Sequence, residues 1–495
     1  MTTTAVRAPQ YSLLIDGERV PSHDGKSVPI HNPANNNETV GEVYVGSIED
    51  AKEAVDSAQA ALKTWRETTP RARSQVLFKA ADLIDGASDE IASTLTKEQG
   101  KPFPEALGEV KFSSAVLRYY AGLSPTISGR RVSLSDPTEF GFVLKQPVGV
   151  CVAITPWNSP VVLMVVKIAP ALAGGNTIVV KPASSTPLAD LMVCDLICKA
   201  GLPKGALNVV TGSGAVVGEE LISNKKVSKV AFTGETETGK RVMSIASRGV
   251  KRVSLELGGS DPMIVFEDAD LDRAVDGALL SRFRNCGQVC MSVKRLYVHE
   301  DKYNVFLEKL SERIKKIRVG NGLASSTRMG PLHSKSQKDK IKEQLEDALQ
   351  KGAKVAYGGS EPKEEELSGG YFYLPTIATS VDTGSKLVQE EVFGPILPVF
   401  RYSTFEEAIA LANDSPYGLG ASVWTRDLDK ANRAADRIDA GTIWINSFHE
   451  AQVDLPFGGL KESGLGKEMA LEGLENYLET KSVVVNSKGK TRPWL

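Results

Sequence analysis

The sequence predicts an α/β protein in which two parallel-sheet units share one chain of 495 residues. From residue 148 onward, short apolar runs alternate with helical patterns, as in VGVCVAI followed by VVLMVVKIAPALAGG. A second alternating block covers roughly residues 262–446, with AKVAYGG, GLGASVWT and GTIWIN as candidate strands. Continuous β-branched runs between helices are typical of strands that are covered on both faces. At about 150 residues per domain, the length suggests about three units.

The remaining elements surround these two units. Residues 49–122 predict helices, because EDAKEAVDSAQAALKTW repeats its apolar residues at nearly 3.6-residue spacing. Within the first unit, NTIVVKP, LNVVTG, KVAFTG and RVSLEL predict further strands, and Leu188–Ala200 predicts a helix. Residues 129–147 predict a hairpin, and YLETKSVVVNSKG predicts a strand near the C-terminus. These peripheral strands have no evident partner, so they indicate either an intersubunit sheet or ordinary edge strands.

Composition and charge exclude several classes of protein. Hydrophobic residues make up 41% and charged residues 24%, as in globular proteins and unlike disordered ones. The 59 basic and 61 acidic residues leave a formal charge of −2, so we expect no binding to nucleic acid or to an anionic membrane surface. Five cysteines are too few for an extracellular disulfide framework, and MTTTAVRAPQYSLL has no apolar signal segment. We therefore expect a cytoplasmic protein.

One charge-free stretch raises the question of a membrane span. No charged residue occurs between Lys145 and Lys167, and that length could cross a bilayer. Prolines, Trp157 and Asn158 interrupt the stretch, and a membrane helix would lose hydrogen bonds there. We predict a buried strand, a turn and a helix.

Familiar metal and nucleotide motifs are missing. The five histidines are scattered without ligand spacing, so a metal site is not expected. No G-x-S-x-G elbow and no G-x-x-x-x-G-K-[ST] loop occurs. Two glycine-rich turns follow predicted strands: GSGAVVG and FTGETETGK. Each indicates either a phosphate-binding turn at a helix N-terminus or a simple tight connection.

Three polar residues stand out against their surroundings. Cys290 follows a glycine turn in RNCGQVC, where it is either a nucleophile or inert packing. Cys286, four residues earlier, would complete half of a metal site, but the other half is missing from the sequence. Glu256 stands in an apolar strand before two glycines, where a carboxylate is costly without a partner or a role. Asn158 lies in a proline-bracketed turn, where its amide could donate a hydrogen bond.

Taken together, these motifs resemble the aldehyde dehydrogenase superfamily over nearly the whole chain, and its succinate-semialdehyde dehydrogenase-like members most closely. The resemblance rests on seven motifs in the family's order: TPWNSP, VVKPASSTP, FTGETETG, LELGGSDP, RNCGQVC, EEVFGPI and PFGGLKESGLG. It implies an aldehyde dehydrogenase-like α/β fold of two Rossmann-like domains and a small β oligomerisation element. The implied cofactor-binding domain comprises residues 1–128 and 148–257, and the catalytic domain residues 258–455. The oligomerisation element comprises residues 129–147 and 478–495, in a homodimer or homotetramer.

The resemblance also assigns catalytic roles. The family converts an aldehyde, NAD(P)⁺ and water to a carboxylate and NAD(P)H. Cys290 matches its nucleophile, and Asn158 matches the amide that stabilises the oxyanion with the backbone N–H of Cys290. Glu256 matches the base that activates water for hydrolysis of the thioester. Lys167 and Glu468 match a relay that takes the proton from Glu256, with a simple salt bridge as the alternative.

On the cofactor side, the resemblance implies contacts with the nicotinamide, the riboses, the pyrophosphate and the adenine. The implied residues are Thr155, Pro156, Trp157, Lys181, Ser184, Gly214, Gly218, Gly234, Glu235, Gly239, Leu257, Glu391 and Phe393.

Two departures from the family pattern bear on the cofactor. Ser184 stands where many NAD-preferring members have a glutamate that would repel a 2′-phosphate. With Lys181 available to pair with that phosphate, we predict that NADP⁺ is preferred and NAD⁺ is the alternative. Glu235 replaces a small hydroxyl residue of the phosphate turn. A carboxylate there must point to solvent or meet a nearby lysine such as Lys240.

The substrate is less closely defined. Arg284 resembles an arginine that holds the distal carboxylate in succinate-semialdehyde dehydrogenases, and a guanidinium suits an anionic tail. Val166 replaces the second arginine of that subgroup, and Gln452 replaces a serine that assists there. Ser159 replaces an aromatic residue, which suggests a channel with fewer rings. We therefore expect a short polar or acidic aldehyde such as succinate semialdehyde, and Arg284 paired with a protein carboxylate is the alternative.

Three other functions remain open. Lactaldehyde, glyceraldehyde-type and aromatic aldehydes are alternative substrates. A CoA-acylating semialdehyde dehydrogenase is disfavoured by Glu256, because that subgroup usually lacks the hydrolytic base. A catalytically silent binding protein is disfavoured by the joint presence of Cys290, Glu256 and Asn158.

Overall fold

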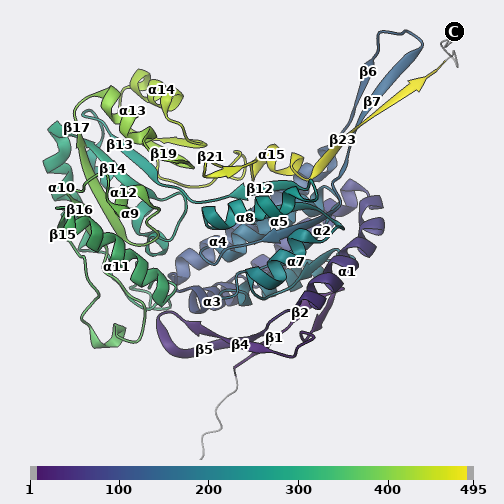
Figure 1. Ribbon diagram of the computed structural model, residues 1–495, viewed down its shortest axis with the longest axis horizontal. Helices are drawn as coiled ribbons and strands as arrows, with labels where there is room; N and C mark the ends of the chain where they lie inside the picture. Colours follow the sequence, from purple (N-terminus) through teal and green to yellow (C-terminus); the bar gives the residue numbers. More distant parts are fainter. Residues whose placement is uncertain (1–7, 488–495) are drawn as a thin grey trace, which may run out of the picture.

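The computed structural model describes residues 8–487 and contains two large, mainly parallel sheets (Figure 1). The first sheet has the order β22-β12-β11-β8-β9-β10-β2-β3, with parallel pairing from β12 through β10. Its strands are β2 (Leu13–Ile15), β3 (Glu18–Val20), β8 (Val150–Ile154), β9 (Thr177–Lys181), β10 (Leu207–Val209), β11 (Val227–Thr233), β12 (Arg252–Glu256) and β22 (Gly464–Leu465). The expected alternation of strands and helices in this unit is confirmed.

Helices cover both faces of this sheet, which explains why its central strands β8 and β9 are buried at every position. Cys151, Ala153 and Val180 face a core shared with five helices, whereas Val152 and Val179 face the opposite side. The five helices are α2 (Pro70–Gly86), α3 (Ser88–Gln99), α4 (Phe103–Leu123), α5 (Pro160–Ala173) and α6 (Leu188–Lys199). The opposite face carries α1 (Ile48–Glu67), α7 (Glu219–Ser223) and α8 (Thr236–Ser247).

The second sheet has the order β15-β16-β17-β14-β13-β19-β20, and only its edge pair β15–β16 is antiparallel. Its strands are β13 (Asp261–Val265), β14 (Val293–His299), β15 (Lys354–Tyr357), β16 (Thr376–Thr379), β17 (Ile396–Tyr402), β19 (Gly420–Trp424) and β20 (Thr442–Ile445). One face carries α9 (Leu271–Phe283), α10 (Glu300–Ile314), α11 (Lys335–Gln350) and α12 (Lys386–Gln389). The other carries α13 (Phe405–Asn413) and α14 (Leu428–Arg437).

A three-stranded antiparallel sheet projects from the body as an arm (Figure 1). It pairs β6 (Arg130–Ser133) with β7 (Glu139–Pro147), and β7 with β23 (Leu478–Asn486) along nine register positions. The two peripheral segments are therefore partners of each other, so the expectation that they lack a partner within the chain is wrong. Residues 488–495 of the predicted oligomerisation element lie outside the described residues.

Smaller elements complete the fold. The N-terminal residues form β1 (Gln10–Tyr11), β4 (Ser27–Asn32) and β5 (Asn35–Tyr44), which no sequence pattern predicted. β18 (Tyr417–Gly418) pairs with β21 (Leu460–Lys461), and α15 (Ala470–Glu475) precedes β23. Short helical turns are η1 (Ser124–Thr126), η2 (Gly214–Gly218), η3 (Arg284–Gly287) and η4 (Glu365–Leu367).

The charge-free stretch forms β8, a turn and α5, as predicted. No helix within residues 8–487 combines the length and the apolar character needed to cross a membrane.

Candidate active site

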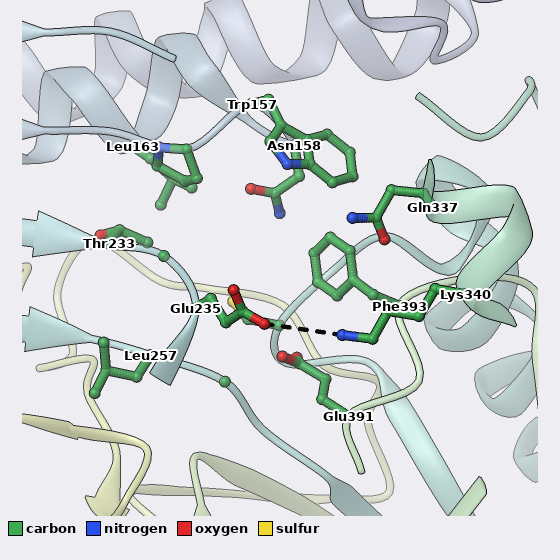
Figure 2. Close-up of a pocket in the computed structure, with 14 residues that line it drawn as sticks. Trp157, Asn158, Leu163, Thr233, Glu235, Leu257, Gln337, Lys340, Glu391 and Phe393 are labelled. Carbon is green, nitrogen blue, oxygen red and sulfur yellow. Dashed lines mark ion pairs between the residues drawn. The ribbon is translucent and has the colours of Figure 1, made fainter. Parts of the chain in front are cut away.

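A cavity lies at the carboxyl ends of β8, β11 and β12 (Figure 2). Parallel strands end at one edge of their sheet, and ligands of α/β proteins bind in the crevice beyond that edge. Helix α11 and the loop before β17 line the cavity from the second sheet. Its lining includes Pro156, Trp157, Gly234, Leu257, Glu391 and Phe393. The Trp157 ring packs edge-on against Phe393, with centroids 5.5 Å apart, and stacks on His333 at 4.6 Å.

A second cavity, of about 590 Å³, adjoins the first. It lies between α4 and two loops, around residues 284–291 and 450–457. Asn158, Leu163 and Cys290 line both cavities. Cys290 therefore lies where the two cavities meet, so two different ligands can approach it from different sides.

The loop before Cys290 has an unusual backbone. Asn285 and Cys286 adopt φ of 49° and 56°, and Gly287 adopts 73°, so three consecutive residues are left-handed. Such non-glycine conformations cost on the order of 1–3 kcal/mol each and persist only when surrounding contacts fix them. Here Asn285 accepts a bond from Gln99 (3.0 Å), donates its N–H to Glu105 (2.8 Å) and donates its amide to the Asn158 carbonyl (2.8 Å). The loop is thus fixed by the helices of the first unit.

The Cys290 thiol is partly buried where the two cavities meet. Burial raises its pKa to about 12; the Lys294 ammonium opposes this rise, and the carboxyls of Glu391, Asp261 and Glu256 add to it. At neutral pH, Cys290 is therefore a thiol, and removal of its proton is part of any nucleophilic attack. Cys286 is also buried and free, and burial raises the pKa of its thiol above the usual value.

Asn158 is buried beside Cys290. Its amide Nδ2 donates to the Gln288 carbonyl (3.0 Å), and its own carbonyl accepts bonds from Lys101 and Asn285, both at 2.8 Å. Lys101 is in turn ion-paired with Glu109 on α4. This network fixes the side chain with an amide hydrogen close to the thiol-bearing loop.

Glu256 ends β12 in a buried cluster of charged groups. Burial raises the pKa of its carboxyl well above the usual value, Glu468 adds to the rise, and Lys167 and Lys467 oppose it. Lys167 Nζ lies 2.7 Å from both Glu468 Oε1 and Thr233 Oγ1. Oε2 of Glu256 has no hydrogen-bond partner within the described residues, and Glu256 is not in the lining of either cavity, whereas Glu468 lines the second.

Further along the first sheet, Lys181, Ser184 and the first glycine turn lie together. Ser184 is exposed and its hydroxyl donates to the Gly212 carbonyl (2.9 Å). A Cβ added to Gly218 would lie 3.6 Å from Cδ of Lys181. Burial lowers the pKa of the Lys181 ammonium to about 8. Gly214 belongs to the same turn, as the first residue of η2.

Two other predicted cofactor residues have packing roles. The Thr155 N–H donates to the Lys181 carbonyl (3.1 Å), and so joins the turn after β8 to the end of β9. Gly239 lies on α8 against Leu257, where an added Cβ would come within 2.3 Å of a Leu257 methyl. Neither residue is in the lining of the first cavity.

The Glu235 side chain is exposed, and its nearest lysine is not Lys240, the example that the sequence suggested. Lys240 pairs with Glu237 (2.9 Å) and Glu462 (3.1 Å), on the outer surface of α8. Glu235 instead lies 3.9 Å from Lys340 of α11, across the first cavity (Figure 2). The sequence suggested the nearer lysine along the chain, whereas the fold brings one from the second unit.

Among the substrate candidates, only Arg284 and Ser159 line the second cavity. Gln452 is exposed outside that lining, whereas its neighbours Glu450 and Ala451 belong to it. Burial raises the pKa of the Glu105 carboxyl to about 7, and the positive charge of Arg284 opposes this rise. No ion pair within 4.0 Å joins Arg284 to a carboxylate in the described residues.

Several residues of the site were missed from the sequence. Glu105 and Glu109 are one turn apart on α4 and point inward, a spacing that could have identified an acidic stripe facing the cavity. Lys294 is buried in an apolar strand four residues after Cys290, and its placement was a second available signal. Within residues 8–487, no three His, Cys, Asp or Glu side chains are grouped to hold a metal ion.

Comparisons with known proteins agree with this geometry. The model of the aldehyde dehydrogenase family matches residues 20–483. Betaine aldehyde dehydrogenase of Bacillus subtilis is 42% identical over 485 residues, which cover 98% of this chain and 99% of that protein. The NADP⁺ succinate-semialdehyde dehydrogenase of Escherichia coli is 41% identical over 472 residues, covering 95% and 97%.

Solved structures give the same result. An NADP-dependent enzyme of Escherichia coli superposes with a TM-score of 0.94 at 41% identity, covering 96% of this chain and 98% of that one. Betaine aldehyde dehydrogenase of Staphylococcus aureus in complex with NAD⁺ superposes with a TM-score of 0.96 at 39% identity, covering 98% and 97%.

Proposed function

This chain belongs to the aldehyde dehydrogenase family, and we propose that it oxidises a short polar or acidic aldehyde, such as succinate semialdehyde, with NADP⁺ as the preferred acceptor. The observation that carries the proposal is the position of Cys290 and Asn158 in the lining of both cavities. An aldehyde in the second cavity and a nicotinamide in the first can then meet at one thiol.

The residues of the first cavity fit a nicotinamide ribose. Glu391 offers a carboxylate to ribose hydroxyls, beside the rings of Phe393 and Trp157. Gly258 leaves space there, since an added Cβ would lie 2.7 Å from Oε2 of Glu391. When bound, NAD(P)⁺ supplies the hydride acceptor.

In the proposed reaction, the Cys290 sulfur attacks the aldehyde carbonyl carbon to form a thiohemiacetal, and the proton that the thiol holds at neutral pH is released to solvent. The amide of Asn158 and the Cys290 N–H stabilise the negative oxygen. Asn158 Nδ2 carries two N–H donors; one is bonded to the Gln288 carbonyl, and the other is available to this oxygen. Loss of hydride from the carbon leaves a thioester on Cys290. Water then cleaves the thioester, which releases the carboxylate and restores the thiol.

Glu256 is the base that we assign to this water. A carboxyl whose pKa is raised by burial suits proton transfer near neutral pH. Since Glu256 does not line either cavity, its side chain must turn toward Cys290 to act, and then back to release the proton. The Lys167–Glu468 pair supports an outward route, because Glu468 lines the second cavity.

The preference for NADP⁺ rests on Ser184 and Lys181. The hydroxyl of Ser184 carries no charge, so nothing at this position repels a 2′-phosphate. Lys181 is an ammonium below pH of about 8 and can pair with the phosphate.

The charges of the second cavity support a polar tail on the substrate. The cations Arg284 and Lys111 favour a carboxylate, and both lack an ion pair within the described residues. Glu105 and Glu450 line the same cavity and would favour a cationic aldehyde, the class named for the betaine aldehyde relatives. Because the cavity has both cations and carboxylates, the charge of the preferred substrate has to be measured.

The test compares kcat/KM for succinate semialdehyde, butanal and betaine aldehyde with NADP⁺. Butanal has the same chain length as the acid but no charge. We expect the acid to be favoured by roughly 100-fold, about 2.7 kcal/mol, and Arg284→Met to reduce that preference to near unity while butanal is unaffected. Equal values for the acid and butanal would contradict the acidic substrate, and a preference for betaine aldehyde would select the cationic class.

We also propose a cytoplasmic homodimer or homotetramer assembled through the arm of β6, β7 and β23. Phe142, Leu144 and Val484 on this arm are exposed hydrophobic residues, which favour an apolar interface.

A further inference from the structure

Lys294 is a fully buried lysine at the start of β14. Its Nζ donates to the carbonyl of Cys290 (2.6 Å), the carbonyl of Gly259 (2.8 Å) and Oε1 of Glu391 (2.7 Å). An ammonium has three N–H donors, and all three are used. Burial of a charge costs several kcal/mol unless it is paired and hydrogen-bonded, as it is here.

The groups that Lys294 contacts belong to different parts of the proposed site. Cys290 carries the proposed nucleophile, and Glu391 is the proposed ribose ligand from the loop before β17. Oε1 of Glu391 also accepts the Gly259 N–H (3.2 Å), whereas Oε2 has no hydrogen bond within the described residues. One oxygen of the carboxylate is therefore fixed by the protein, and the other is available to a ligand in the first cavity.

Charges around Cys290 are unfavourable to a thiolate without this lysine. Glu391, Asp261 and Glu256 all act to keep the proton on the thiol, and Lys294 is the cation that opposes them. Asp261 lies close by: burial raises the pKa of its carboxyl to about 8, and Lys294 opposes this rise most strongly. Lys294 is the cation that acts most strongly on the thiol.

We propose that Lys294 is a positioning residue that holds the Cys290 carbonyl and the Glu391 carboxylate in fixed relation and favours the Cys290 thiolate by its charge. This inference rests on the proposed function, since it assigns to Lys294 the alignment of the nucleophile with the cofactor. The site would then need the Lys294 ammonium as well as the Cys290 thiol and the Glu391 carboxylate.

The experiment measures alkylation of Cys290 by iodoacetamide against pH, with the modified peptide quantified by mass spectrometry, together with KM for NADP⁺. In Lys294→Met, we expect the alkylation rate below pH 9 to fall about tenfold, because the thiolate fraction falls as the pKa rises. We expect KM for NADP⁺ to rise about tenfold as Glu391 loses its anchor.

Lys229→Met is the matched control. Lys229 is also buried and bonded to Ser254, but it contacts neither Cys290 nor Glu391. We expect its alkylation profile and KM to match wild type. Coincident profiles for Lys294→Met and wild type, or equal shifts in both lysine variants, would overturn the proposal.

A second variant changes the other member of the Lys294–Glu391 pair and should change the alkylation rate in the opposite direction. It also provides a test if Lys294→Met does not fold. Glu391→Gln removes a carboxylate that disfavours the thiolate and leaves Lys294 charged. Alkylation of Cys290 below pH 9 should then become faster than in wild type, and an unchanged or slower rate would overturn the proposal. Alkylation needs no aldehyde, so failure of wild type to reduce NADP⁺ would refute the proposed function separately.

Discussion

The two cavities that meet at Cys290 are built differently. The first is lined by turns that directly follow β8, β11 and β12, so the parallel sheet sets their positions. The second is lined by α4 and by two loops, and its charged side chains come from elements that are far apart in the sequence. The comparison indicates that the first sheet positions Asn158, Gly234 and Glu256 through its strand ends, whereas the loop of Cys290 depends on contacts between separate elements.

The largest loss of turnover is expected from substitution of Glu256, at the end of β12. Glu256→Gln should reduce steady-state turnover by roughly 10²–10⁴-fold while a burst of NADPH remains, because the thioester forms but is not hydrolysed. The wild-type turnover should rise with pH, since a carboxyl with a raised pKa must lose its proton to act as a base, and the variant should lose that dependence.

Rapid mixing of enzyme and NADP⁺ with aldehyde measures the burst. Cys290→Ala is the matched control and should show neither burst nor turnover. If Glu256→Gln also lacks the burst, Glu256 acts before hydride transfer, as the base for the thiol.

A smaller effect, on cofactor preference, is expected from substitution of Ser184, which follows β9 of the first sheet. Ser184→Glu should shift the ratio of kcat/KM for NADP⁺ and NAD⁺ toward NAD⁺ by about 10–100-fold, because the carboxylate repels a 2′-phosphate and accepts from ribose hydroxyls. In wild type, the preference for NADP⁺ should weaken above pH of about 8, as Lys181 loses its proton. Cofactor ratios that do not change with the substitution would refute the role of Ser184.

The smallest effect, on KM for NADP⁺, is expected from removal of the Glu235–Lys340 ion pair across the first cavity. Glu235 and Lys340 are both exposed and 3.9 Å apart, so the pair contributes little to stability, about 0–1 kcal/mol. Glu235→Ser should leave the melting temperature within a few degrees and lower KM for NADP⁺ by a few fold, because a carboxylate is removed from near the expected phosphates. Titrations at low and high salt measure this, and a higher KM would show that Glu235 assists cofactor binding.

The sequence was sufficient for the parts of the site that follow single strands. The turns that contain Asn158 and Gly234, and the strand that ends at Glu256, were each identified from an apolar run and its polar exit. The pairing of Glu235 with Lys340, rather than Lys240, was missed because it joins residues of two different units.

The supports of the site were missed for the same reason. Asn285 is held by Gln99 and Glu105, which lie about 180 positions earlier in the chain. The N-terminal strands β2 and β3 are only three residues long and show little periodicity, so no sequence pattern predicts them. β2 is specified instead by its antiparallel pairing with β10 on one side and β3 on the other.

The central claim is that Cys290 becomes acylated between the two cavities. Glu256→Gln mixed with NADP⁺ and succinate semialdehyde, then quenched in acid, should carry one succinyl group, which peptide mass spectrometry should locate on Cys290. Formation of succinate and NADPH by the wild type, with no acyl group on Cys290 in the variant, would contradict the account.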